Sequence, residues 1–122
     1  MKKILIVEDE FFVRNPLKLY LQMKGYEIHE KENGLGVLEL HEKEKFDLII
    51  CDIVMPEKEG IDTIKELKDR HPDVKIISMS GSDKISPENY LFMTKLLGIE
   101  IALAKPFRTE YLYKAVEMLI GH

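Results

Sequence analysis

Five polar side chains that could act together on a phosphate group each follow a short apolar run of the 122-residue sequence. They are three carboxylates, a hydroxyl and an ammonium: Glu8, Asp9, Asp52, Ser80 and Lys105. Three carboxylates placed close together repel one another unless a cation or raised pKa values relieve them. Magnesium is the simplest relief, because it prefers oxygen ligands and takes one or two carboxylates together with phosphate oxygens.

Each of these residue types has a task in phosphoryl transfer. Asp52 is suited to be the nucleophile, because carboxylates form acyl-phosphate intermediates. A bound cation neutralises charge on the incoming phosphoryl group, while Ser80 donates a hydrogen bond to it and Lys105 holds another of its oxygens. The set therefore predicts a magnesium-assisted acceptor of phosphoryl groups with Asp52 at its centre.

The apolar runs that precede these residues predict the strands of a parallel sheet. They are short and rich in β-branched residues, as is typical of strands buried on both faces. The four main runs are residues 4–7, 48–51, 76–79 and 101–104, and a weaker alternating run at 26–30 predicts an edge strand. Ligands of such sheets bind beyond the carboxyl ends of the strands, so we expect the five polar side chains to share one rim.

Helical patterns fill the intervals between the strands. They cover residues 13–21, 35–43, 61–67, 86–97 and 112–120. Ser86 and Pro87 form a cap and a first-turn proline, which is a strong helix start. Pro16 lies inside the first pattern and removes a backbone donor, so a late start or a local bend is expected there. Strand and helix alternate five times, which predicts an α/β doubly wound (βα)5 sandwich.

Composition limits the classes of protein to which this chain can belong. Apolar residues make up 45% and charged residues 33%, which predicts one globular domain over residues 1–122. The formal net charge of −4, with no basic run, argues against nucleic-acid binding. The sequence has no signal peptide and no apolar stretch near the roughly 20 residues that span a bilayer. Its one cysteine, Cys51, is expected to be buried and reduced, so we expect a cytoplasmic protein without membrane contact.

Four motifs, in this order and at these spacings, resemble those of the receiver domain of bacterial two-component response regulators. The resemblance covers almost the whole chain. The motifs are Val7-Glu8-Asp9-Glu10, Asp52-Ile53-Val54-Met55-Pro56 with Gly60, Ser80-Gly81, and Lys105-Pro106-Phe107. Each one is weak alone, but the four together are very specific.

The resemblance implies a flavodoxin-like sheet with strand order 2-1-3-4-5 and a phosphoacceptor at Asp52. It also implies a magnesium site organised by Glu8, Asp9, Asp52 and the main-chain carbonyl of Val54. Such a receiver takes its phosphoryl group from a histidine kinase or a histidine phosphotransfer protein and signals to a downstream protein partner. It is not an enzyme beyond catalysing its own phosphorylation and dephosphorylation.

The same resemblance implies that Ser80 and Lys105 contact the phosphoryl group and that the Lys105–Pro106 bond is cis, as only about 5–6% of such bonds are. One position departs from the family pattern. Receivers often carry Tyr or Phe three residues before the lysine, where this chain has Ala102. We therefore expect the output to come from movement of Ser80 and of the 80–88 loop, which would change the 80–105 surface.

Three other functions fit the residues less well. An aspartate-based phosphatase of the haloacid dehalogenase type usually has a second acid two residues after the nucleophile, where this chain has Val54. A flavodoxin-like cofactor binder needs a hydroxyl-rich or glycine-rich phosphate loop, and Glu8-Asp9-Glu10 would repel the phosphate. A pseudo-receiver scaffold usually lacks the acceptor aspartate or the acidic residues, and this chain has all of them. Within the receiver hypothesis, a stand-alone regulator, a relay carrier and the receiver of a longer regulator with an output domain remain open.

Overall fold

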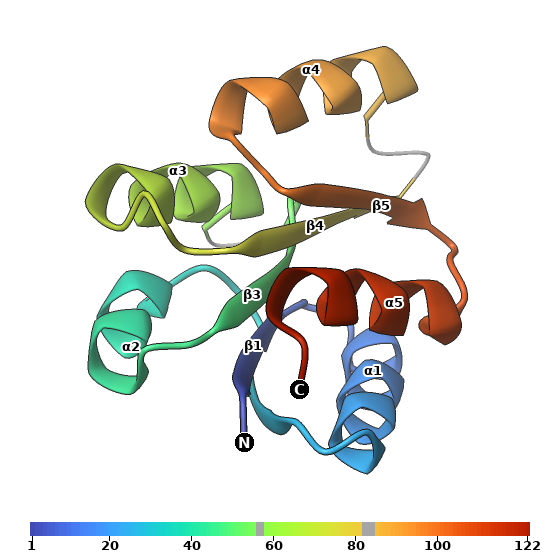
Figure 1. Ribbon diagram of the computed structural model, residues 1–122. Helices are drawn as coiled ribbons and strands as arrows, with labels where there is room; N and C mark the ends of the chain where they lie inside the picture. Colours follow the sequence, from blue (N-terminus) through green and yellow to red (C-terminus); the bar gives the residue numbers. More distant parts are fainter. Residues whose placement is uncertain (56–57, 82–84) are drawn as a thin grey trace.

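Five parallel strands form the central sheet of the computed structural model, which describes residues 1–55, 58–81 and 85–122. The strand order is β2-β1-β3-β4-β5, which confirms the expected order 2-1-3-4-5 (Figure 1). The strands are β1 (Lys3–Val7), β2 (Glu27–Lys31), β3 (Leu48–Asp52), β4 (Ile76–Gly81) and β5 (Ile101–Lys105). Pro56 of the second motif and residues 82–84 of the expected output loop lie outside the described residues.

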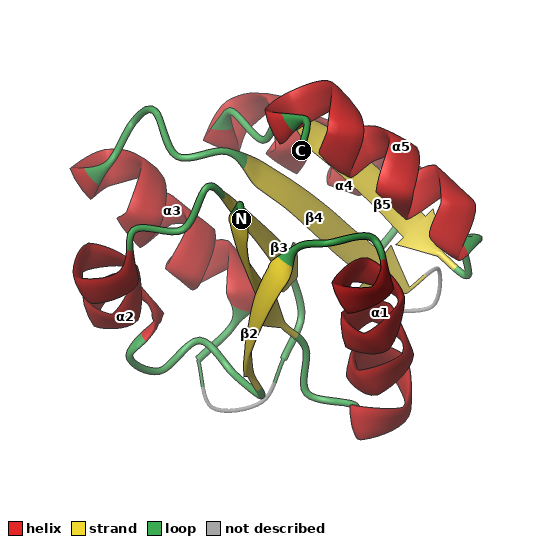
Figure 2. Ribbon diagram, turned by 60° about the horizontal axis from the view of Figure 1, so that its bottom comes forward, coloured by secondary structure: helices red, strands yellow, loops and turns green. Residues whose placement is uncertain are grey.

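One helix follows each strand along the chain. The helices are α1 (Phe11–Met23), α2 (Val37–Glu44), α3 (Gly60–Arg70), α4 (Pro87–Leu97) and α5 (Thr109–Ile120). Helices α1 and α5 cover one face of the sheet, and α2, α3 and α4 cover the other (Figures 1 and 2). This arrangement confirms the doubly wound (βα)5 sandwich.

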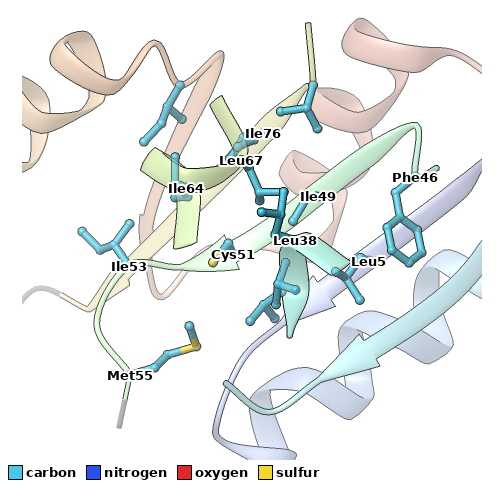
Figure 3. Packing of buried hydrophobic residues seen from close by; sticks show 14 of the residues in the cluster. Leu5, Leu38, Phe46, Ile49, Cys51, Ile53, Met55, Ile64, Leu67 and Ile76 are labelled. Carbon is cyan, nitrogen blue, oxygen red and sulfur yellow. The ribbon is translucent and has the colours of Figure 1, made fainter. Parts of the chain in front are cut away.

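Alternation along the strands builds a separate hydrophobic core on each face. Successive side chains of a strand point to opposite faces of the sheet. In β1, Ile4 and Ile6 therefore pack with α1 and α5, whereas Leu5 and Val7 pack with the helices on the other face. Figure 3 shows part of that second core, which includes Leu5 and Ile49 of the sheet and Leu67 of α3. Every residue of β3 is buried, so both faces of this central strand are covered.

Two helix starts differ from the sequence expectation. Helix α1 already begins at Phe11, so a late start is wrong, and the exposed Pro16 lies inside the helix. The alternative expectation, a local bend at Pro16, stays a prediction. The buried contacts of Leu17 and Leu21 hold this helix against the sheet despite the missing backbone donor. Helix α2 begins at Val37, two residues later than expected, because Gly36 before it has left-handed backbone angles with φ 76°.

The start of α4 agrees with the sequence expectation. Ser86 Oγ accepts a hydrogen bond from the Asn89 N–H at 3.3 Å, and Pro87 occupies the first turn. Across residues 1–55, 58–81 and 85–122, every helix is too short or too polar to cross a membrane.

Gly60 lets the start of α3 touch the end of β3 backbone to backbone. A Cβ atom at this position would lie 1.8 Å from the Asp52 carbonyl oxygen and 2.7 Å from Ile53 Cα. The Ile61 N–H also donates to the Ile53 carbonyl at 3.2 Å. Because backbone atoms leave no room for a side chain, glycine at this position determines where the strand end carrying Asp52 lies relative to α3.

We predict that Gly60→Ala lowers the free energy of unfolding by about 2–3 kcal/mol, because the added methyl forces β3 and α3 apart. Urea denaturation measures this loss. The control is Gly98→Ala, which strains a left-handed position by about 1–2 kcal/mol but meets no neighbouring atom within 4 Å. Amide NMR shifts at Asp52 and Ile53 should change in Gly60→Ala alone, and wild-type shifts in that variant would contradict the packing argument.

Candidate functional site

The five residues singled out from the sequence lie at the carboxyl ends of neighbouring parallel strands. Glu8 and Asp9 directly follow β1, Asp52 ends β3, Ser80 is the next-to-last residue of β4, and Lys105 ends β5. Because the strands are parallel, these ends share one edge of the sheet, as predicted. The edge is therefore the candidate site.

One ammonium group lies between two buried carboxylates at this edge. Lys105 Nζ donates to Asp52 Oδ2 at 3.0 Å and also to Glu8 Oε1. The side chains of Glu8 and Asp52 are fully buried, and that of Lys105 is 17% exposed. Strand β4 lies between β3 and β5, so the long lysine side chain reaches past the end of β4 to both acids.

Burial and pairing act in opposite directions on these ionisable groups. Burial raises the pKa of Glu8 to about 7, although hydrogen bonds from Lys105 and from the Glu10 N–H oppose the rise. Burial alone would lower the pKa of Lys105, but its bonds to Glu8 and Asp52 outweigh that effect and raise it. The lysine is therefore charged at neutral pH.

Both carboxylate oxygens of Asp52 have partners. Oδ1 accepts a hydrogen bond from the Val54 N–H at 3.2 Å, while Oδ2 accepts from Lys105. The preceding residue, Cys51, is fully buried, and its thiol donates to the Asp52 carbonyl at 3.2 Å. Burial raises the pKa of the Cys51 thiol, so it stays protonated and acts as the small buried residue expected from the sequence.

The turn after β1 concentrates carboxylate oxygens. Oxygens of Glu8, Asp9 and Glu10 lie within 4.8 Å of one another. Within the described part of the chain, Asp9 Oδ1 is buried and has no hydrogen-bond partner. An unpaired buried oxygen beside two further carboxylates fits a hard divalent cation such as Mg²⁺, because that ion binds oxygen ligands. The donor set thus agrees with the predicted metal.

The group of three acids in the structure is not the same set of metal ligands that the sequence predicts. Glu10 belongs to the three-acid group, and the sequence prediction left it out although it stands in the same motif. Asp52 is not in that three-acid group, although Lys105 bonds to both Asp52 and Glu8. The part of the Val54 carbonyl in metal binding stays a prediction.

Ser80 is at the edge, but its hydroxyl makes only a local contact among the described residues. The residue is 2% exposed, and Oγ donates to the Gly81 carbonyl at 3.3 Å. Its contact with a phosphoryl group therefore stays a prediction. The Lys105–Pro106 peptide bond is cis, which confirms the expectation from the motif.

Comparison with known proteins gives one consistent family. The family model described as "Response regulator receiver domain" matches residues 4–117. The chain is 34% identical to the chemotaxis protein CheY of Thermotoga maritima, covering 94% of each protein. It is 30% identical to sporulation initiation phosphotransferase F of Bacillus subtilis, covering 95% of this chain and 91% of that protein.

Other relatives are much longer. The chain is 34% identical to the sensor kinase CckA of Brucella abortus over 96% of its own length, but it spans only 12% of that kinase.

Among solved structures, the response regulator TrrA of Thermotoga maritima, in complex with Mg²⁺ and BeF, superposes with a TM-score of 0.84 at 33% identity. That match covers 98% of this chain and 99% of TrrA.

We predict that Lys105→Met destabilises the metal-free protein by about 3–5 kcal/mol at pH 8, because it leaves two buried carboxylates without their cation. The loss should shrink towards pH 5. A carboxyl whose folded pKa is raised, as that of Glu8 is, gives stability below its unfolded pKa and loses it as the pH rises through the folded value. Removing the lysine raises that folded pKa further, so the deficit grows with pH.

Urea denaturation in EDTA between pH 5 and pH 8 measures this difference. Lys95→Met is the control, because Lys95 is an exposed lysine of α4. A Lys105→Met deficit that stays constant over this pH range would contradict the shared-ammonium interpretation.

Proposed function

The chain belongs to the response regulator receiver domain family, and we propose that Asp52 is the residue on which it accepts a phosphoryl group. The observation that carries this proposal is the carboxylate of Asp52, buried at the end of β3 and bonded to the Lys105 ammonium at 3.0 Å. The function of the family to which it belongs is signalling in two-component and phosphorelay systems. Alternatives such as a dehalogenase-type phosphatase or a flavodoxin-like cofactor binder lack this support.

The proposed step is a displacement at phosphorus. A carboxylate oxygen of Asp52 attacks the phosphorus of a phosphohistidine, the P–N bond breaks, and the imidazole leaves with its electron pair and takes a proton. Lys105 then turns from the carboxylates towards a phosphoryl oxygen and keeps its positive charge throughout. Ser80 donates its hydroxyl hydrogen to another phosphoryl oxygen. The product is an acyl phosphate on Asp52.

Mg²⁺ fits the three-acid turn and, when bound, supplies positive charge against the phosphoryl oxygens. We propose that Asp9 holds it directly, because Asp9 Oδ1 is the buried oxygen that has no partner in the described structure. Glu8 and Asp52 contribute the remaining carboxylate charge, and the main-chain carbonyl of Val54 contributes a neutral oxygen ligand. The complex of the relative TrrA with Mg²⁺ and BeF supports the presence of a magnesium site in this chain.

The donor of the phosphoryl group is proposed to be a histidine kinase or a histidine phosphotransfer protein. Similarity to a sensor kinase and to a sporulation phosphotransferase supports this class of partner. The surface beside the acidic turn suits protein docking, because Phe11 and Phe12 at the start of α1 are 53% and 88% exposed. Large exposed apolar side chains next to a reactive site are typical of interaction surfaces.

A downstream protein partner is proposed to read the surface of α4 and β5. Leu91, Phe92 and Leu96 of α4 are exposed. Leu91 also lines a hollow of about 360 Å³, whose other lining residues include Ser80 and Ala102. The small side chain at position 102 leaves this space unfilled, so movement of Ser80 has room to shift the α4 surface without an aromatic residue on β5.

Other parts of the proposal follow from the composition. The negative net charge supports a regulator that does not bind nucleic acid directly, and the proposal includes a cytoplasmic location without membrane contact. The chain catalyses no reaction beyond its own phosphorylation and dephosphorylation. It acts as a regulator, as a relay carrier, or as the receiver of a longer regulator.

We predict that incubation with acetyl phosphate and Mg²⁺ adds one phosphoryl group to the wild-type protein and none to Asp52→Asn, because the amide is a poor nucleophile. Intact-mass measurement detects the addition. EDTA should abolish it in the wild type, since the carboxylates then repel the incoming phosphoryl group.

Asp73→Asn is the matched control, because Asp73 lies in the exposed loop between α3 and β4. It should be labelled as the wild type is. Labelling that persists in Asp52→Asn would show that another side chain is the acceptor.

A further inference from the structure

Arg14 of α1 reaches back to the turn that carries the acids. Its Nη1 donates to the main-chain carbonyl of Glu8 at 2.7 Å, and its backbone N–H donates to the Glu10 carbonyl at 2.9 Å. These two carbonyls flank Asp9 in the chain. The Arg14 side chain thus holds the carbonyl that directly precedes Asp9, and its backbone bond belongs to the first turn of α1.

The guanidinium of Arg14 is itself held from the neighbouring strand. Its Nε donates to Glu30 Oε1 of β2 at 2.8 Å, and Lys18 Nζ donates to the other oxygen of Glu30 at 2.6 Å. These bonds lower the pKa of Glu30, so its carboxylate stays charged. The Arg14 side chain is only 12% exposed, and it also lies 5.8 Å from the centre of the Phe11 ring. A planar group held by partners on three sides is well fixed.

The backbone of the turn is held on its other side as well. The Glu8 N–H donates to the Lys31 carbonyl of β2 at 3.0 Å. The peptide units around Glu8 therefore have one partner from β2 and one from α1. The direction of Asp9, the next residue, depends on both contacts.

We propose that Arg14 is a positioning residue for the cation site: it fixes the Glu8 carbonyl and thereby aims the Asp9 carboxylate at the bound ion. This inference rests on the proposed function, because it takes Asp9 as the direct Mg²⁺ ligand. Groups that orient metal ligands without touching the metal commonly change metal affinity about 10–100-fold when they are replaced.

The test compares Arg14→Gln with Lys18→Gln. Both variants remove a cation from the same carboxylate of Glu30, but only Arg14 also holds the Glu8 carbonyl. Calorimetric titration with MgCl₂ should show about tenfold weaker binding in Arg14→Gln and less than a twofold change in Lys18→Gln. Arg14→Lys should bind Mg²⁺ nearly as weakly as Arg14→Gln, because an ammonium lacks the fork that spans both partners.

A kinetic measurement separates positioning from general damage to the site. The rate of labelling by acetyl phosphate should need about tenfold more Mg²⁺ in Arg14→Gln, while the rate at saturating Mg²⁺ stays within about twofold of the wild type. If Arg14→Gln does not fold, Glu30→Gln replaces it, since this change removes the partner that orients the guanidinium, and it should weaken Mg²⁺ binding by severalfold.

Two results would overturn the inference. One is Mg²⁺ affinity in Arg14→Gln within twofold of the wild type, and the other is an equal loss in Lys18→Gln. Failure of the proposed function looks different, because the wild-type protein itself would then bind no Mg²⁺ or take no phosphoryl group on Asp52.

Discussion

A single ammonium group pairs with two fully buried carboxylates, and the arrangement of the sheet edge depends on this constraint. Lys105 bonds to both Glu8 and Asp52, which come from different strands. Buried charges are tolerated only when they are paired and hydrogen-bonded. One positive charge against two negative ones, with Asp9 close to Glu8, leaves the edge with surplus negative charge. The fold therefore maintains an edge that gains stability from a further cation, and this suits a site that binds a metal ion reversibly.

The doubly wound topology makes this charge arrangement possible. Strand β1 lies beside β3, so Glu8 and Asp52 leave the sheet next to each other, whereas β5 lies two strands away from β3. A side chain that comes from β5 must be long to reach both acids, and lysine is long enough to pass the end of β4. On the other side of Asp52, the Gly60 backbone touches the Asp52 carbonyl, so the acceptor is held by α3 as well as by the sheet.

Much of this arrangement could be predicted from sequence, because strand patterns and strand-end residues are local signals. The alternation of strand and helix patterns predicts the element order. Because the strands are parallel, Asp52 and Lys105 come to the same edge of the sheet in whatever order the strands lie. The detailed contacts depend on distances that no local pattern contains. The place of Glu10 in the acid group, the local hydrogen bond of Ser80 and the early start of α1 before Pro16 all arise from tertiary packing. The contact between Arg14 and the Glu8 carbonyl joins residues of α1 and of the turn after β1, which sequence spacing alone does not reveal.

Two cationic side chains lie next to the acidic turn, and they contact different groups: Lys105 contacts carboxylates, whereas Arg14 contacts a main-chain carbonyl of the turn. Lys105 contacts carboxylates directly, and this contact keeps Glu8 and Asp52 buried but also occupies an oxygen of each. A second cation on the Asp9 carboxylate would compete with a metal ion for the same oxygens. Arg14 avoids this competition, because it holds a main-chain carbonyl while Glu30 balances its charge. The turn is thus fixed by a strong charge-assisted hydrogen bond, and the negative charge of Asp9 stays available for a metal ion.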